Sequence, residues 1–267
     1  MIRKATYNRV AQLIAILVCA FALKHLYSTA NVNELRWILA PTTTLVEIIS
    51  GASFNFESHA GYMSSDRSFL IAGSCAGVNF LITAFLMLSL GRLWKTNLSW
   101  KFIPGALVFA YMATLVANAV RIATALQLQQ RPSEIGWLSS NQIHRLEGIL
   151  IYFGFLLLLF LLSEQLDDRR SREVQSLGSF RRLKVRGQVP VRLPNRFRSL
   201  SQFVFPLVIY YATTIGMPLA NAVYRREINA DTFFEHSTFV LIAPLLLIMP
   251  VIALLLIRAR LGSEQSH

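Results

Sequence analysis

Long apolar runs, separated by short polar or basic segments, dominate the hydropathy pattern of this chain. Crossing the ~30 Å hydrocarbon core of a bilayer takes ~20 helical residues. Continuous apolar runs indicate helices rather than barrel strands, which would alternate. The pattern predicts an all-α, polytopic membrane bundle of six to eight transmembrane helices. The six clear spans are Val10–Tyr27, Ser68–Leu90, Phe102–Ala125, Leu146–Leu162, Phe203–Ala220 and Thr238–Ile257.

One further segment, Trp37–Ser50, is shorter and more polar than these spans. It contains Pro41, Glu47 and three threonines. It fits a re-entrant or interfacial helix, or one of a closely spaced pair of crossings. We treat it as a segment that does not cross the membrane.

The basic residues orient the bundle, because lysine and arginine concentrate in cytoplasmic loops. With a cytoplasmic N-terminus, the inside segments hold three cations before the first span and three between the second and third. Ten more lie in the loop after the fourth span and two in the tail, so that 18 of the 26 basic residues lie inside. This prediction places both termini in the cytoplasm.

The basic loop also divides the chain. We expect a membrane-embedded core over residues 1–163, a basic cytoplasmic loop over 164–201, and a C-terminal transmembrane hairpin and tail over 202–267. The net charge of +12 would suggest nucleic acid in a soluble protein. Here the loop is better explained as a topology determinant in contact with anionic lipid, and no nucleic-acid partner is expected.

Composition agrees with a membrane protein: 54% of residues are hydrophobic and 15% are charged, against roughly 25% charged in soluble domains. The two cysteines, Cys19 and Cys75, each lie in an apolar run, which argues against a disulfide framework. The basic N-terminus lacks a convincing cleavage site and is interpreted as part of a retained first span.

Three polar side chains on successive spans fall at similar depth on the outer side. Cys75 lies in Gly-Ser-Cys-Ala-Gly, about two turns into its predicted span, Arg121 near the outer end of the next, and His144 at the outer start of the one after. An arginine inside a membrane costs at least ~2.5 kcal/mol at a helix centre, and it usually faces a partner or a polar cavity.

These residue types suit acyl transfer. An imidazole can deprotonate a thiol, the thiolate can attack a peptide carbonyl, and a fixed guanidinium can stabilise the resulting oxyanion. The simpler alternatives are a packed cysteine, an arginine that reaches the interface and a loop histidine. The three residues support one another as a group.

Other residues near the three are weaker candidates for supporting or substrate-binding roles. Asn118 lies one turn before Arg121, Asn79 one turn after Cys75, and Glu147 one turn after His144, where it can orient the imidazole. Gly77 would let a helix or a substrate approach the thiol. No metal-ligand spacing is evident, and we expect neither metal nor cofactor.

In order, Cys-Ala-Gly, Asn-x-x-Arg and His-x-x-x-Gly (ending at Gly148) resemble the signature of the exosortase/archaeosortase family over residues 68–162. The resemblance implies Cys75 as nucleophile, with Arg121 and His144 as its catalytic partners. It also implies exported protein substrates with a tripartite C-terminal sorting signal: a short motif such as Pro-Glu-Pro, a transmembrane helix and a basic cluster. Val78-Asn79-Phe80 and the short core depart from the commonest members and suggest a compact subfamily similar to exosortase K.

The sequence therefore predicts a multi-pass protein of a prokaryotic plasma membrane that cleaves or transfers exported proteins on the outer side. A transporter, or a non-enzymatic assembly subunit of an envelope or polysaccharide export system, is the alternative. Intramembrane charge also marks transport pathways, but inverted repeats and paired broken helices are not evident. Only the enzyme needs the sulfur of Cys75.

Overall fold

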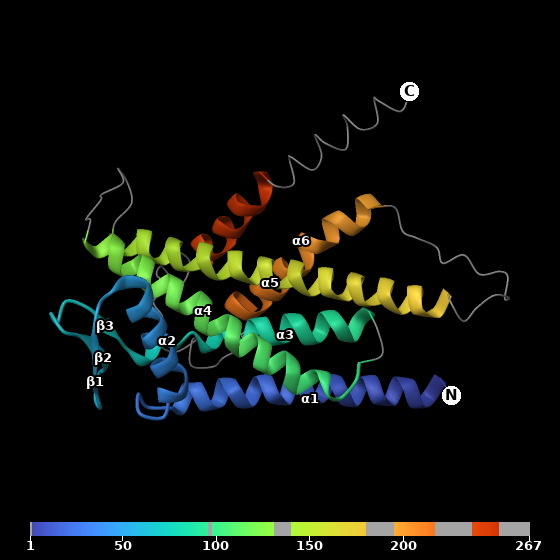
Figure 1. The fold of residues 1–267 in the computed structure, drawn as a ribbon, viewed down its shortest axis with the longest axis horizontal. Coiled ribbons are helices and arrows are strands. Elements are labelled where there is room, and N and C mark those ends of the chain that lie inside the picture. Colours follow the sequence, from blue (N-terminus) through green and yellow to red (C-terminus); the bar gives the residue numbers. More distant parts are fainter. Residues whose placement is uncertain (1, 96–97, 131–139, 180–194, 217–236, 251–267) are drawn as a thin grey trace, which may run out of the picture.

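A computed structural model of the chain describes residues 2–95, 98–130, 140–179, 195–216 and 237–250. It is mostly helical, with one small sheet between the second and third helices (Figure 1). The elements are α1 (Ile2–Thr29), α2 (Arg36–Ser50), β1 (Phe54–Glu57), β2 (Gly61–Ser64), β3 (Leu70–Ile71), the 3-10 turn η1 (Gly73–Ala76), α3 (Val78–Lys95), α4 (Phe102–Gln130), α5 (Ser140–Ser179), α6 (Asn195–Tyr211) and the π-helical turn η2 (Ala212–Gly216). A further helix covers Ser237–Pro250.

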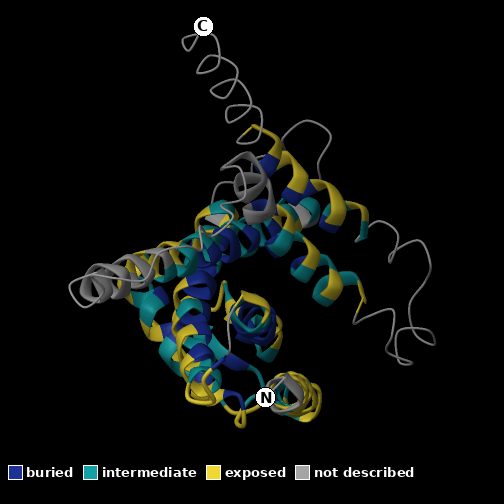
Figure 2. Ribbon diagram, turned by 90° about the vertical axis from the view of Figure 1, so that its right-hand side faces the viewer, coloured by how far each residue is buried: buried dark blue, intermediate teal, exposed yellow. Residues whose placement is uncertain are grey.

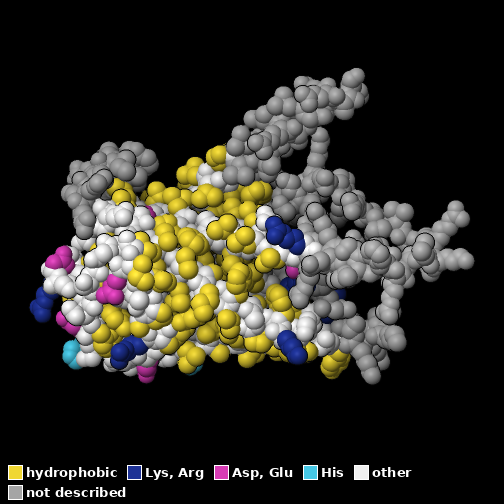
Figure 3. Space-filling view, viewed as in Figure 1, with side chains coloured by type: hydrophobic (Ala, Val, Ile, Leu, Met, Phe, Trp, Pro, Cys, Tyr) yellow, Lys and Arg dark blue, Asp and Glu magenta, His cyan; other side chains and the backbone are white. Residues whose placement is uncertain are grey.

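Four of the described helical segments are long and apolar enough to cross a membrane. They are Thr6–Thr29, Gly73–Lys95, Phe102–Gln129 and Gln142–Asp167. Figure 3 shows a broad apolar belt across the bundle, with charged side chains gathered toward its two ends. A belt of this kind suits contact with lipid tails, and the chain is a helical membrane protein.

The predicted fifth and sixth spans are shorter where the structure describes them. Their apolar helices are Phe203–Gly216 and Ser237–Pro250, and the rest of both predicted spans lies outside the described residues. The segment at Trp37–Ser50 forms the 15-residue helix α2, which is shorter than the ~20 residues a crossing needs.

Helix α3 occupies the centre of the bundle and is surrounded by α1, α4, α5 and α6 (Figure 2). Its residues from Phe80 to Ser89 are all buried, as expected of a helix that is hydrophobic on every side. In contrast, only 17% of the α1 span is buried against 72% of the α3 span. The outer helices thus present apolar side chains to the surroundings while α3 forms the core.

The sheet is a feature that the prediction of an all-α fold missed. Its three antiparallel strands have the order β1-β2-β3, and the turn between β2 and β3 is held by Asp66, which accepts hydrogen bonds from Ser64 Oγ (2.6 Å) and Ser68 Oγ (2.8 Å). These bonds lower the pKa of Asp66 to about 2. Strands of two to four residues are too short to show a clear alternation in sequence.

The predicted start of the second span at Ser68 is also wrong, because the short strand and turn that occupy this region leave no clear pattern in the sequence. Residues 70–76 form β3 and η1, and α3 begins only at Val78. Gly77 adopts a left-handed conformation, with φ of 71°, which favours glycine and ends the 3-10 turn. Cys75 therefore lies in a turn at the N-terminal end of α3, and not two turns inside a helix.

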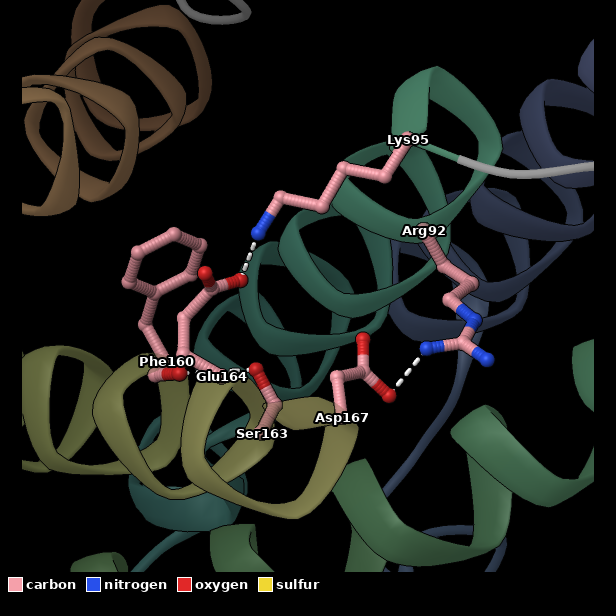
Figure 4. Close-up of polar contacts among 6 residues, drawn as sticks. All are labelled: Arg92, Lys95, Phe160, Ser163, Glu164 and Asp167. Atoms are coloured by element: carbon pink, nitrogen blue, oxygen red, sulfur yellow. Dashed lines mark hydrogen bonds and ion pairs between the residues drawn. The ribbon is translucent and has the colours of Figure 1, made fainter. Parts of the chain in front are cut away.

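At the opposite end of α3, two ion pairs join it to α5 (Figure 4). Lys95 pairs with Glu164 and Arg92 pairs with Asp167. Helix α5 continues to Ser179, so the domain boundary expected at residue 163 falls within a helix. We call this region, defined by Arg92, Lys95, Glu164 and Asp167, the Arg92 end of the bundle.

Candidate active site

Cys75 lies where the sheet meets the membrane helices. The turn η1 connects β3 to α3, and it is closed by a hydrogen bond from Cys75 N to Ala72 O (2.9 Å). The thiol is free and the residue is partly buried. Cys75 thus lies on a tight turn at the N-terminal end of α3, and neighbouring residues fix its main chain.

Asn118 of α4 supplies the main support of this turn. Its side chain is completely buried, and its Nδ2 donates to the Cys75 carbonyl oxygen at 2.6 Å. A Cβ at Gly77 would lie 3.1 Å from Asn118 Cγ, so the glycine allows the amide to approach the turn closely. The Cys-Ala-Gly and Asn-x-x-Arg motifs thus meet through this contact.

Arg121 lies one turn further along α4 and is held by α5. Its Nη1 donates to Tyr152 Oη at 2.8 Å, and Tyr152 Oη in turn donates to Asn118 Oδ1 at 2.7 Å. The Tyr152 ring stacks on Phe80 of α3, with centroids 5.0 Å apart. A continuous chain of hydrogen bonds therefore runs from the guanidinium through Tyr152 and Asn118 to the main chain of Cys75.

Arg121 is also the electrostatic link between the predicted catalytic residues. Its guanidinium interacts with Cys75 and Glu147 and with the imidazole of His144. Gly148 leaves room for it, because a Cβ there would lie 3.6 Å from Arg121 Cδ. Among the described residues, no carboxylate forms a direct ion pair with Arg121, although Glu147 lies within range of its charge.

His144 and Glu147 form a second pair at the start of α5. His144 Nδ1 lies 3.2 Å from Glu147 Oε2, and the side chains are 53% and 8% exposed. The contact leaves Nε2 as the imidazole nitrogen that can accept a proton. The other carboxylate oxygen, Oε1, is buried and has no hydrogen-bond partner within the described part of the chain.

The structure thus gathers Cys75, Asn118, Arg121 and the glycines Gly77 and Gly148. His144 and Glu147 reach this group through the charge of Arg121, and no hydrogen bond joins the imidazole to the thiol in the described residues. We call the whole group, together with Tyr152, the Cys75 end of the bundle.

Asn79 contacts a neighbouring helix, since Lys24 Nζ of α1 donates to Asn79 Oδ1 at 2.9 Å, and its role in substrate binding stays a prediction. Sequence reasoning missed both Lys24 and Tyr152. The signal for Tyr152 was its position four residues after Gly148, on the same helix face. A tyrosine in an apolar run is too common to be singled out on that basis.

The site contains no cluster suited to a metal: no group of three histidine, cysteine, aspartate or glutamate side chains occurs among the described residues. A separate pocket of about 260 Å³ opens at the Arg92 end, lined by apolar residues of α3, α4 and α5 together with Arg92, Ser163, Glu164 and Asp167. Its lining residue nearest to the Cys75 turn along α3 is Met87, which lies ~14 Å from Val78, the first residue of the helix, at ~1.5 Å per residue.

Comparison of the chain with protein-family models, with curated proteins and with solved structures finds no match.

Proposed function

We propose that this protein is a membrane-embedded cysteine peptidase or transpeptidase of the exosortase type, with Cys75 as its nucleophile. The observation that carries the proposal is the chain of hydrogen bonds from Cys75 O through Asn118 and Tyr152 to Arg121. A purely structural arginine inside a membrane would be expected to pair with a carboxylate or a carbonyl. The direct partner of Arg121 is a neutral phenol, and both the Cys75 thiol and the Glu147 carboxyl lie within range of its charge.

In the proposed reaction, His144 removes the proton of the Cys75 thiol through Nε2, while Glu147 holds Nδ1. The thiolate attacks the scissile carbonyl carbon, and the carbonyl electron pair moves onto oxygen. Arg121 stabilises this oxyanion, because a fixed positive charge at the site is favourable where negative charge develops. His144 then returns its proton to the leaving amine, the C–N bond breaks, and a thioester remains on Cys75.

A second nucleophile resolves the thioester. Water, deprotonated by His144, would release the substrate as a free acid, whereas an amine would take the acyl group in a transpeptidation. In either case Cys75 leaves as a thiolate and recovers its proton. The cycle conserves the energy of the acyl bond in the thioester and uses side chains of this chain alone.

The proposal includes the expected orientation. The N-terminus is cytoplasmic, the Cys75 end faces outward and the Arg92 end faces the cytoplasm of a prokaryotic cell. The bundle then contains six to eight spans with the C-terminal hairpin. The substrates are exported proteins that carry a sorting signal with a membrane helix and a terminal basic cluster.

The test uses cells in which the native gene is replaced by the Cys75→Ala variant. We expect exported proteins that retain a C-terminal helix to accumulate, as measured by mass spectrometry of the membrane fraction. The matched control is Cys19→Ala, which removes the other free thiol, on α1, and should leave processing intact. Immunoblotting verifies that both variants accumulate in the membrane.

The opposite result is equally informative. If mature forms persist in Cys75→Ala cells at wild-type levels, the sulfur has no chemical role. The intramembrane charges would then belong to a transporter or to a non-enzymatic subunit of an export system, and the enzyme proposal would be abandoned.

A further inference from the structure

Strand β3 is an edge strand of the sheet, and one residue beyond it the chain enters η1, the turn that carries Cys75. Ser64 N donates to Phe69 O at 2.9 Å, and Leu70 pairs with Met63. Hydrogen bonds in an antiparallel pair point alternately toward and away from the partner strand. The main-chain N–H and C=O of Leu70 therefore point away from β2, toward the open edge.

The neighbouring polar groups on this edge are already used. Ser68 O accepts a hydrogen bond from Gln129 Nε2 of α4 at 3.2 Å, and Ala72 O accepts one from Cys75 N. Between these two capped carbonyls, the N–H and C=O of Leu70 have no partner within the described residues. Leu70 is 37% exposed, whereas Ile71 is fully buried and anchors the strand.

The other edge of the sheet differs. Phe54 N of β1 donates to Glu47 Oε1 at 2.8 Å, so a carboxylate from α2 covers the start of that edge. No chain continuity links β1 to the turn η1, because β2 lies between them. The two edges are therefore not equivalent: in the part of the chain that the structure describes, β3 alone joins an open donor and acceptor to the proposed nucleophile.

We infer that an extended segment of the substrate polypeptide binds by adding to β3 as a fourth strand, which brings its scissile carbonyl to Cys75. This inference rests on the proposed function and names its mode of substrate recognition. Strand addition uses main-chain hydrogen bonds for affinity and leaves side-chain pockets to give specificity. It also holds a peptide in the extended form that attack on its carbonyl requires.

The geometry limits the length of the segment. From Leu70 to Ala72 the chain is extended, at ~3.3 Å per residue, and from Ala72 to Cys75 it rises ~2 Å per residue in the 3-10 turn. The path is at most about 13 Å, which corresponds to roughly four residues of extended substrate. Recognition should therefore depend on about four residues to one side of the scissile bond.

The decisive variant is Leu70→Pro. Proline removes only an N–H that points away from β2, and prolines are tolerated at such edge positions. Its ring also blocks the approach of another strand. In cells we expect at least a tenfold loss of processing by Leu70→Pro. Leu70→Ala keeps the N–H, and it should process at least ten times more substrate than Leu70→Pro.

Phe56→Pro is the matched control, because the N–H of Phe56 points outward on the β1 edge. This variant should process substrates normally.

Alkylation of Cys75 by iodoacetamide in isolated membranes reports whether the turn remains intact. We expect Leu70→Pro to be labelled at the wild-type rate. Wild-type processing by Leu70→Pro, or an equal loss in Leu70→Ala, would overturn strand addition and leave the proposed function untouched. If instead the Cys75→Ala variant still processes its substrates, the proposed function itself fails.

A second measurement covers the case in which Leu70→Pro does not accumulate. The photo-crosslinker p-benzoylphenylalanine is placed at Leu70 or at the exposed Asn55 of β1, each in the Cys75→Ala background, where uncut substrate should remain bound. Adducts with tailed exported proteins from position 70 and not from 55 support the inference. Equal adducts from both positions, or none from 70, contradict it.

Discussion

The positively charged side chains at the two ends of the bundle have different kinds of partner. At the Arg92 end, each of two cations meets a carboxylate of α5, and the side chains of the Arg92–Asp167 pair are 24% and 35% exposed. At the Cys75 end, Arg121 is held by the neutral hydroxyl of Tyr152, and Glu147, a carboxylate within range of the Arg121 charge, directly contacts His144. Opposite charges form direct ion pairs at one end, whereas the direct partner of the cation at the other end is a neutral hydroxyl.

This difference in direct partners distinguishes charged residues with a structural role from a charged residue with a proposed catalytic role. A compensated pair near the end of a span fastens two helices together and contributes at most about 1 kcal/mol when it is partly exposed. A cation that is held by a hydrogen-bonded network without a direct ion-pair partner is costly, and it is useful where negative charge develops during a reaction. Matched substitutions at the two ends test whether they differ in this way.

The largest effect is expected for Arg121→Gln. Loss of the oxyanion-stabilising charge should slow processing by about 100-fold or more, measured by pulse-chase labelling of an exported substrate. Arg92→Gln, the same substitution at the other end, should change the rate by less than about twofold, since its role is to pair with Asp167. Similar losses in both variants would erase the distinction between the ends.

Tyr152→Phe should have the next largest effect, a loss of about tenfold in processing rate. The change removes the hydroxyl that joins Arg121 to Asn118, at a net cost of about 1–3 kcal/mol, and keeps the ring on Phe80. Tyr111→Phe is its control: Tyr111 Oη donates to Trp37 O at 2.7 Å, away from the site, and its loss should leave the rate unchanged. An active Tyr152→Phe enzyme would show that Arg121 needs no such support.

Gly77→Ala should reduce processing several-fold. Two costs combine: the left-handed backbone, about 1–2 kcal/mol for a residue with a Cβ, and the collision of that Cβ with Asn118. Gly51→Ala isolates the first cost, because Gly51 has φ of 72° and nothing within 4 Å of its Cβ position. Thermal unfolding in detergent should show both variants destabilised, and only Gly77→Ala should lose activity beyond its lower abundance.

The smallest effect is expected for Asp167→Asn at the Arg92 end. Breaking the ion pair with Arg92 should lower the thermal midpoint by about 1–3 °C and leave processing unchanged. The double variant Arg92→Gln, Asp167→Asn should lose no more than the single variant, because the pair is removed as a unit. A large loss of activity in either variant would mean that this end also takes part in the reaction.

Hydropathy was sufficient to locate the four long apolar helices that the structure describes, but it did not predict the geometry of the site. The predicted span Phe102–Ala125 starts where α4 starts, and Leu146–Leu162 lies inside α5, because long apolar runs leave no alternative to a helix. The turn at Cys75 was missed because its geometry depends on Gly77 and on a contact with Asn118, 43 residues away. Long-range contacts of this kind leave no periodic pattern in a sequence.

The same limit applies to the role of individual polar residues. The one-turn spacing of His144 and Glu147 predicted their approach, since neighbours on one helix face follow from helical geometry alone. The partnership of Arg121 with Tyr152 joins α4 to α5 and depends on how the two helices pack. The short sheet was also invisible in sequence, although its third strand leads into the candidate nucleophile.

The loose packing of α1 has a consequence for how the protein is made. This helix is synthesised before α3, and with only 17% of its span buried it can enter the bilayer as a free-standing segment. Until α3 follows, the Lys24 ammonium lacks its partner Asn79, 55 residues later in the chain, and it must extend toward the lipid headgroups. Docking of α1 onto α3 therefore comes after insertion of both helices, so the region around Cys75 is completed as a late step of biogenesis.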